Sequence, residues 1–415
     1  MSQPTDPDGS RRVAEQAART SYGRLIAILS MRRRDIAAAE DALSEALIAA
    51  LRTWPQTGVP TNPDAWLLTA ARNRQKNEAR ARSVRQAAEP ELMQQIELAE
   101  ETVQASDRRL ELMFVCAHPA IDPAARAPLM LQTVLGIDAA TIARAFLVEP
   151  ATMSQRLVRA KARIRDAGLR FGIPDRAEMA GRLDAVLDAI YAAFGQGWDR
   201  LDLPDMPEAL TGEAIWLARL VVEMLPQEPE AKGLLALMLY SSARRLARRD
   251  DAGRFVPLDR QDPRLWDRTR ILEAEALLTV ASRAGRFGRY QCEAAIQSVH
   301  VQRPLTGRLN LTALLKLYDL LVTHADSIGA RIGRAVVLAE TGDIGSARAE
   351  LDDLPQDRVR RHQPWWVARS QVSLLAGDIA DAIACLTEAI RLTERPEIRD
   401  HLSDRRETLV RSLPA

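Results

Sequence analysis

The residues best suited to do chemistry lie in the segment VEPATMSQRLVRAKARIR, from Val148 to Arg165. Arginine, glutamine and hydroxyl side chains near the start of a helix can hydrogen-bond to base edges in a DNA groove, and cations farther along can meet phosphates. The residues placed to reach bases are Thr152, Ser154, Gln155, Arg156 and Arg159. Those placed to reach phosphates are Lys161, Arg163 and Arg165.

Two short helices joined by a tight turn are expected to position these side chains. Asp138 is a helix N-cap, and Pro150 suits the first position of the next helix. The second helix repeats its apolar residues at Met153, Leu157 and Ile164, so its arginines fall on another face. A basic helix that is merely solvated is the simpler alternative, but the capping and the preceding helix favour a helix-turn-helix.

A second basic segment follows Asn62 and Pro63, which read as an N-cap and a first helical residue. Its cations lie four residues apart on one face, at Arg72, Lys76 and Arg80. Trp66 offers a surface on which an unstacked base could rest, and it could equally be a core residue at the start of an apolar stripe.

The helix before this segment is amphipathic with an acidic side. Its apolar stripe is expected to consist of Ile36, Leu43, Leu47, Leu51 and Trp54. Glu40, Asp41 and Glu45 lie on the other side.

The C-terminal half is a succession of Ala- and Leu-rich amphipathic helices. AETGDIGSARAEL, from Ala339, aligns with LLAGDIADAIACL, from Leu374, at a spacing of 35 residues. This spacing is close to the ~34 residues of tetratricopeptide repeats, in which small residues such as Ala347 and Ala382 allow close helix packing. We expect an array of helical pairs that binds a protein partner.

Composition favours helices and gives no sign of catalysis. The chain has 415 residues, 47% hydrophobic and 4% aromatic, with a net charge of +1. Cys116, Cys292 and Cys385 are expected to be small core residues, and the five histidines show no metal spacing. We therefore expect no enzyme, no cofactor and no metal. Without an apolar run long enough to span a membrane or act as a signal peptide, the chain is expected in the cytoplasm.

Taken together, these segments resemble the extracytoplasmic-function sigma factors of bacterial RNA polymerase. AAAEDALSEALIAALRTWP is similar to the region 2 helix that docks on core polymerase, and PDAWLLTAARNRQKNEARAR is similar to the segments that melt and read the −10 element. LQTVLGIDAATIARAFLVEPATMSQRLVRAKARIR resembles region 4, which reads the −35 element. LPQEPEAKGLLALMLYSSARR, DRQDPRLWDR and GRYQCEAAIQSVH resemble a C-terminal tetratricopeptide-like extension with a regulatory role.

The resemblance implies roles for individual residues. Those implied to contact polymerase are Glu40, Asp41, Ser44 and Glu45. Those implied to contact the −10 element are Trp66, Arg72, Asn73, Lys76 and Arg80. Ser44, Asn77 and Ala79 differ from the family's usual residues, which leaves open a sigma-like scaffold protein that no longer initiates transcription.

We therefore predict an all-α protein with a region 2 domain, a region 4 helix-turn-helix domain and a helical tetratricopeptide-like array. The expected boundaries are a disordered N-terminus over 1–20, region 2 over 21–84, a linker over 85–107, region 4 over 108–172 and the array over 175–415. Core RNA polymerase, promoter DNA and a protein partner of the array are the expected partners. A fragment ending at Phe171 is expected to be soluble on its own.

Overall fold

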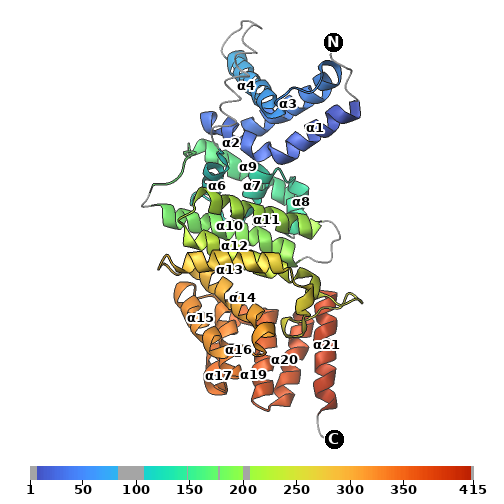
Figure 1. Ribbon diagram of the computed structural model, residues 1–415, viewed down its shortest axis with the longest axis vertical. Coiled ribbons are helices and arrows are strands. Elements are labelled where there is room, and N and C mark those ends of the chain that lie inside the picture. The colour runs from blue at the N-terminus through green and yellow to red at the C-terminus, as the bar shows by residue number, and fades with distance from the viewer. Residues whose placement is uncertain (1–6, 83–106, 147, 176–177, 200–205, 413–415) are drawn as a thin grey trace. The chain divides into compact units, whose positions relative to one another are not determined.

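A computed structural model describes residues 7–82, 107–146, 148–175, 178–199 and 206–412, in two compact units, Met1–Met224 and Leu225–Ala415 (Figure 1). Within these described ranges the regular elements are helices, accompanied by an isolated bridge between Arg249 and Phe255. The prediction of an all-α fold is therefore confirmed. The linker expected over 85–107 lies outside the described residues except for Asp107.

The first unit holds the sequence segments expected to bind polymerase and DNA. Its helices are α1 (Pro7–Thr20), α2 (Tyr22–Arg33), α3 (Ile36–Thr57), α4 (Pro63–Arg82), α6 (Arg109–Cys116), α7 (Pro123–Leu135), α8 (Ala139–Ala145), α9 (Pro150–Asp166), α10 (Met179–Asp199) and α11 (Met206–Met224).

Side-chain caps begin three of these helices, and those at Asn62 and Asp138 lie at the positions predicted above from the sequence. The Asn62 side-chain oxygen accepts a hydrogen bond from the Ala65 N–H at 3.1 Å, at the start of α4. Asp122 accepts one from Ala124 at 2.9 Å before α7, and Asp138 accepts one from Thr141 at 2.9 Å before α8. Because each cap satisfies a backbone N–H that the helix itself leaves unpaired, the positions of these helix starts follow from local sequence.

The N-terminus differs from expectation. Pro7–Thr20, part of the segment expected to be disordered, forms helix α1. Ala14 and Ala17 are buried, at 3% and 6% exposure, and α1 packs against α3. The polar composition of this segment gave no indication that two small residues would allow this contact.

The boundary between the compact units also differs from expectation. It falls after Met224 and not near Gly172–Asp175, because α10 packs on α6 and α7. Arg182 of α10 donates a hydrogen bond to the Phe114 carbonyl at 2.8 Å. The Arg109 guanidinium lies over the Trp216 ring of α11, 4.3 Å from its centroid. Helices α10 and α11 therefore complete the first unit.

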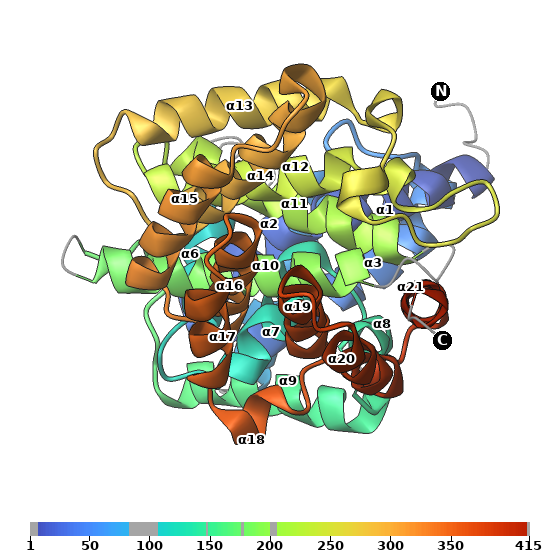
Figure 2. The ribbon, with the colours of Figure 1, turned by 90° about the horizontal axis from the view of Figure 1, so that it is seen from below.

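The second unit is a succession of antiparallel helical pairs and short turns (Figure 2). Its helices are α12 (Pro229–Ala243), α13 (Arg268–Ser282), α14 (Arg289–Thr306), α15 (Leu311–His324), α16 (Ile328–Glu340), α17 (Ile344–Asp352), α18 (Gln356–Val359), α19 (Gln363–Leu375), α20 (Ile379–Leu392) and α21 (Pro396–Arg411). Three 3-10 turns, η2 (Arg245–Arg248), η3 (Leu258–Arg260) and η4 (Pro263–Leu265), connect α12 to α13.

The internal repeat seen in the sequence has the same local structure in both copies. Gly342 and Gly377 have φ of 95° and 80°, a region that favours glycine, and each ends the first helix of a pair. The following aspartates, Asp343 and Asp378, each cap the second helix through their side chains. Ala347 and Ala382 are fully buried at equivalent positions, so α16–α17 and α19–α20 are two copies of one helical hairpin.

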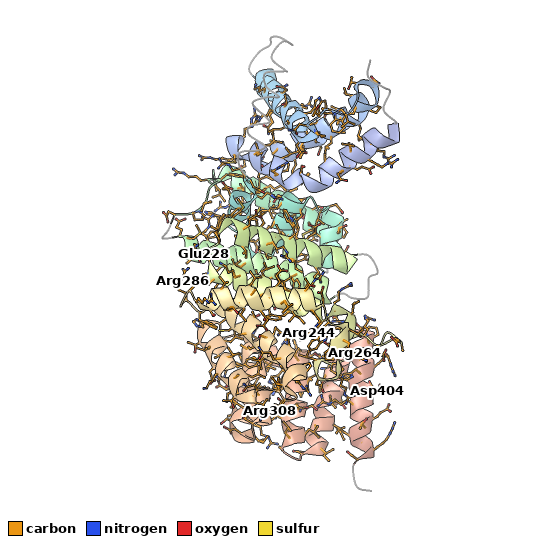
Figure 3. All side chains as sticks on the ribbon, in the orientation of Figure 1. Glu228, Arg244, Arg264, Arg286, Arg308 and Asp404 are labelled. Carbon is orange, nitrogen blue, oxygen red and sulfur yellow. The ribbon has the colours of Figure 1, made fainter. Side chains whose placement is uncertain are left out.

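Charged side chains of the second unit have partners in neighbouring segments, and the cysteines of both units are core residues. Arg244, directly after α12, donates hydrogen bonds to Gln297 of α14 and to the Tyr240 carbonyl, and Glu228 pairs with Arg286 at 3.5 Å (Figure 3). Cys116, Cys292 and Cys385 are all buried, and burial raises the pKa of each thiol to about 12. The prediction that the cysteines are core residues is confirmed.

The contact of α10 with α6 and α7 predicts how two truncated chains will behave. A fragment ending at Met224 should be monomeric and should unfold in one cooperative transition. A fragment ending at Phe171 should lose several kcal/mol of stability, because it exposes the apolar surface that α10 covers. Chemical denaturation, size-exclusion chromatography and dye binding measure this difference. Equal stability of the two fragments would mean that the domain boundary lies near Gly172, as the sequence predicts.

Candidate nucleic-acid interface

Helices α8 and α9 form the predicted pair of short helices joined by a tight turn. Met153, Leu157 and Ile164 of α9 are almost fully buried, as their spacing predicts, and α9 packs on α7 and α8. Pro150 occupies the first turn of α9. Because the apolar face is buried, the opposite face of α9 is turned to solvent.

The outward face of α9 carries most of the side chains expected to reach bases. The exposed members of that set are Thr152, Ser154, Gln155 and Arg159. Arg163, which was expected to reach phosphate, is exposed as well. Arg156 is half-buried and donates a hydrogen bond to the Ala124 carbonyl at 3.3 Å. Arg156, Arg159 and Arg163 line a hollow of about 410 Å³ beside the start of α7. The Asp122 side chain also lines this hollow, so three guanidinium groups and one carboxylate leave a net positive surface, which is suited to a phosphate backbone.

Lys161 does not lie on this surface. It is only 9% exposed, and its Nζ forms an ion pair with the Glu40 Oε2 at 2.5 Å. The expectation that Lys161 contacts phosphate is wrong for this conformation, because its ammonium group is paired with a carboxylate of α3. Helical spacing puts Lys161 between the apolar and basic faces, and a tertiary contact decides its partner.

The other member of that pair, Glu40, belongs to the set expected to contact polymerase. Burial is the main cause that raises the pKa of Glu40, and the Lys161 ammonium opposes it. The neighbouring carboxylate of Asp41 also raises this pKa. Glu40 therefore faces α9 in this structure and does not share a surface with the rest of its set.

Asp41, Ser44 and Glu45 are exposed together on α3. Ile48 and Leu51 extend the same face and are 45% and 47% exposed. Leu51 was expected in the buried stripe, and this expectation is wrong. Its spacing fits both the buried Trp54 and the exposed Ile48, so spacing alone does not decide its side. Two apolar side chains beside three polar ones form a surface suited to a protein partner.

Helix α4 carries the residues expected to meet the −10 element. Trp66 is half-buried and meets Trp54 edge to face, with ring centroids 5.5 Å apart. Arg72 and Asn73 are half-buried, and Lys76 is exposed. The backbone of α4 is helical through Arg82, but the side chains of Asn77, Ala79 and Arg80 lie outside the described residues.

A polar brace holds α4 against α2. Asp64 at the start of α4 accepts hydrogen bonds from the Ser21 hydroxyl at 2.7 Å and from the Arg24 guanidinium. Arg33 at the end of α2 donates to the Gln75 carbonyl at 2.6 Å. The two contacts lie at opposite ends of α2, so they fix the direction of α4. Sequence reasoning missed this brace, because its partners are about 40 residues apart.

Two other kinds of site are absent from the part of the chain that the structure describes. Among them there is no group of three or more His, Cys, Asp or Glu side chains arranged to hold a metal ion. None of the helices in the described ranges has the length and apolar character needed to cross a membrane.

Comparison with known proteins gives matches in both halves of the chain. Residues 18–85 match sigma-70 region 2, and residues 182–282 match a family of unknown function, DUF6596. Uncharacterized protein R00370 of Rhizobium meliloti (strain 1021) is 38% identical over 330 residues, which cover 77% of this chain and 78% of that protein. The crystal structure of yeast Tom70 aligns with a TM-score of 0.34 at 13% identity, covering 97% of this chain and 84% of that one.

The brace between α2 and α4 predicts the effect of removing its acceptor. Asp64→Ala should lower the free energy of unfolding by ~1–3 kcal/mol, because it leaves the Ser21 hydroxyl and a partly buried guanidinium without their acceptor. Glu15→Ala, which removes the partner of Arg11 in an exposed pair, should change it by less than ~0.5 kcal/mol. Urea denaturation compares the two. An equal effect of both would mean that the brace contributes nothing.

Proposed function

This chain belongs to the family of the Rhizobium meliloti protein R00370 and carries the region 2 domain of sigma factors, and we propose that it binds core RNA polymerase and directs it to specific promoters. The observation that carries this proposal is the match of residues 18–85 to sigma-70 region 2, which spans α2, α3 and α4. That domain supports a role in promoter recognition, and it is not a domain of enzymes. In this proposal the chain acts in the cytoplasm, where it meets polymerase and DNA.

Region 2 would make two kinds of contact. The exposed face of α3, with Asp41, Ser44, Glu45, Ile48 and Leu51, would dock on core polymerase. The start of α4, where Trp66 meets Trp54, and the cations after it would engage the −10 element. The mixture of apolar and acidic side chains on α3 fits a protein partner, whereas the basic side of α4 fits nucleic acid.

Helices α8 and α9 would act as region 4 and read the −35 element. The burial of the apolar face of α9 and the exposure of Arg159 and Arg163 support this role. The chain would then be an extracytoplasmic-function sigma factor. The second unit, with its repeated helical hairpins, would regulate it by binding a protein partner, because stacked hairpins offer an extended binding surface.

Run-off transcription with core polymerase tests the proposal. The full-length chain should support a defined transcript from its promoter, and a fragment ending at Met224 should support the same transcript without regulation by the second unit. A chain that binds polymerase but yields no transcript would favour the second candidate, a sigma-like scaffold protein. Ser44 on the docking face of α3 is the observation that favours this candidate, because related factors commonly carry glutamine there.

Two substitutions in α9 test the assignment of its faces. Arg156→Ala should weaken recognition of one −35 base pair by ~1–3 kcal/mol, because a guanidinium pairs bidentately with a guanine edge. Arg163→Ala should weaken binding to all sequences alike and lower the salt dependence by about one charge. Competition binding with point-substituted −35 duplexes separates the two. Equal losses on every duplex for both variants would refute a base-reading role of Arg156.

A further inference from the structure

A long connection joins the first two helices of the second unit. The segment Arg244–Asp267, here called the strap, links α12 to α13, whereas the hairpins α16–α17 and α19–α20 need only a short Gly-Asp turn. The strap packs against the last helix of the unit (Figure 1). Arg249 pairs with Glu397 of α21 at 3.3 Å, and the Phe255 ring meets the His401 ring edge to face, with centroids 5.5 Å apart. The strap is therefore held at both of its ends and along its length.

The strap and the end of α14 enclose a hollow of about 270 Å³. Leu258, Pro263, Trp266 and Pro304 contribute apolar surface to it. Pockets for drug-sized ligands measure roughly 300–1,000 Å³, so this one suits a smaller molecule. Because a water molecule takes about 30 Å³ of the liquid, the hollow has room for a ligand of roughly nine non-hydrogen atoms.

Two side chains that line the hollow carry buried polar atoms without a partner. Trp266 is 8% exposed, and its Nε1–H donates to no described residue. The Gln261 Oε1 is also buried and accepts from none, although the Gln261 Nε2 donates to the Val256 carbonyl at 3.2 Å. Buried polar groups are almost always hydrogen-bonded, because an unpaired one costs free energy. One such donor and one such acceptor beside the same hollow indicate a ligand that carries both kinds of group.

Opposite charges line the hollow without pairing with each other. Arg303 of α14 and Asp259 of the strap are both exposed. The side chain of neither forms a hydrogen bond or an ion pair within the part of the chain that the structure describes. His300 also lines the hollow and is neutral at pH 7, because burial, Arg244 and Arg303 lower its pKa to about 4. One cation and one anion fit a ligand with one carboxylate and one ammonium group.

Two other charged residues lie near the hollow but not on its surface. Arg405 of α21 donates a hydrogen bond to Gln371 of α19. Glu340, at the end of α16, is near Arg303 and Asp259, and burial is the main cause that raises its pKa. Neither Arg405 nor Glu340 is among the described residues that line the hollow. A charged ligand inside it therefore meets Arg303 and Asp259 first.

We propose that the hollow between the strap and α14 binds a free α-amino acid with an apolar side chain. The carboxylate of the ligand pairs with Arg303 and accepts from the Trp266 Nε1–H. Its ammonium group pairs with Asp259 and donates to the Gln261 Oε1, and its side chain lies against the apolar surface. Because the ligand contacts both the strap and α14, its binding ties them together. This inference goes beyond the proposed function and does not depend on it.

Calorimetric titration of the full-length chain with L-leucine and L-phenylalanine tests the site. We expect at least one of them to bind with a Kd of about 1 mM or tighter. Isocaproate and hydrocinnamate lack the ammonium group, and isoamylamine and phenethylamine lack the carboxylate. Each analogue should bind about tenfold or more weakly than its parent, because it loses a charge-assisted hydrogen bond. The site is rejected if neither amino acid binds, or if the analogues bind as tightly as their parents.

Substitutions at the two charged residues test their separate roles. Arg303→Met should weaken binding of the amino acid about tenfold or more but should not weaken binding of the amine. Asp259→Asn should weaken binding of the amino acid equally but should not weaken binding of the carboxylate analogue. Arg308→Met and Asp251→Asn are controls at exposed positions that do not line the hollow, and they should keep full affinity (Figure 3). Equal losses in the controls would contradict the assigned pairing.

Hydrogen exchange locates the bound ligand. The amino acid that binds should slow amide exchange in η3, in η4 and at the end of α14, because it ties these segments together, and should leave α20 unchanged. Slower exchange confined to other parts of the chain would overturn the site. None of these measurements uses polymerase or DNA, so a chain that binds the amino acid but lacks promoter activity would reject the proposed function alone.

Discussion

The burial of one apolar stripe on α9 is the constraint on which the proposed DNA-binding surface depends. Met153, Leu157 and Ile164 are removed from water, and each such side chain contributes roughly 1.5–3 kcal/mol to folding. This inward packing sets the rotation of the helix about its axis. Arg159 and Arg163 consequently point to solvent, and their exposure depends on buried residues on the opposite face of the helix.

Close approach between helices is the second constraint, and small residues provide it. Gly23 allows α2 to meet the backbone of α7, and Ala14 and Ala17 allow α1 to rest on α3. In the second unit, Ala347 and Ala382 occupy the same place in two successive hairpins. Because larger side chains would force these helices apart, the small residues determine which helices become neighbours.

Charged residues in the first unit serve both to brace the fold and to bind, and the structure separates the two roles. Asp64 is occupied by Ser21 and Arg24, and Lys161 is occupied by Glu40. Asp41 on α3 and Arg163 on α9 remain exposed. A partly buried charge is stable only with a partner, so the paired residues hold the modules while the exposed ones are suited to ligands.

The sequence by itself determined what depends on neighbours along the chain. The caps at Asn62, Asp122 and Asp138, the buried face of α9 and the repeated Gly-Asp turn all follow from spacings of a few residues, for which helical geometry is sufficient. Only the tertiary structure decided the pairing of Lys161 with Glu40, the exposure of Leu51, the burial of α1 and the place of α10 in the first unit. Each of these depends on which helix lies across from the residue, and periodicity carries no information about a partner that is tens of residues away.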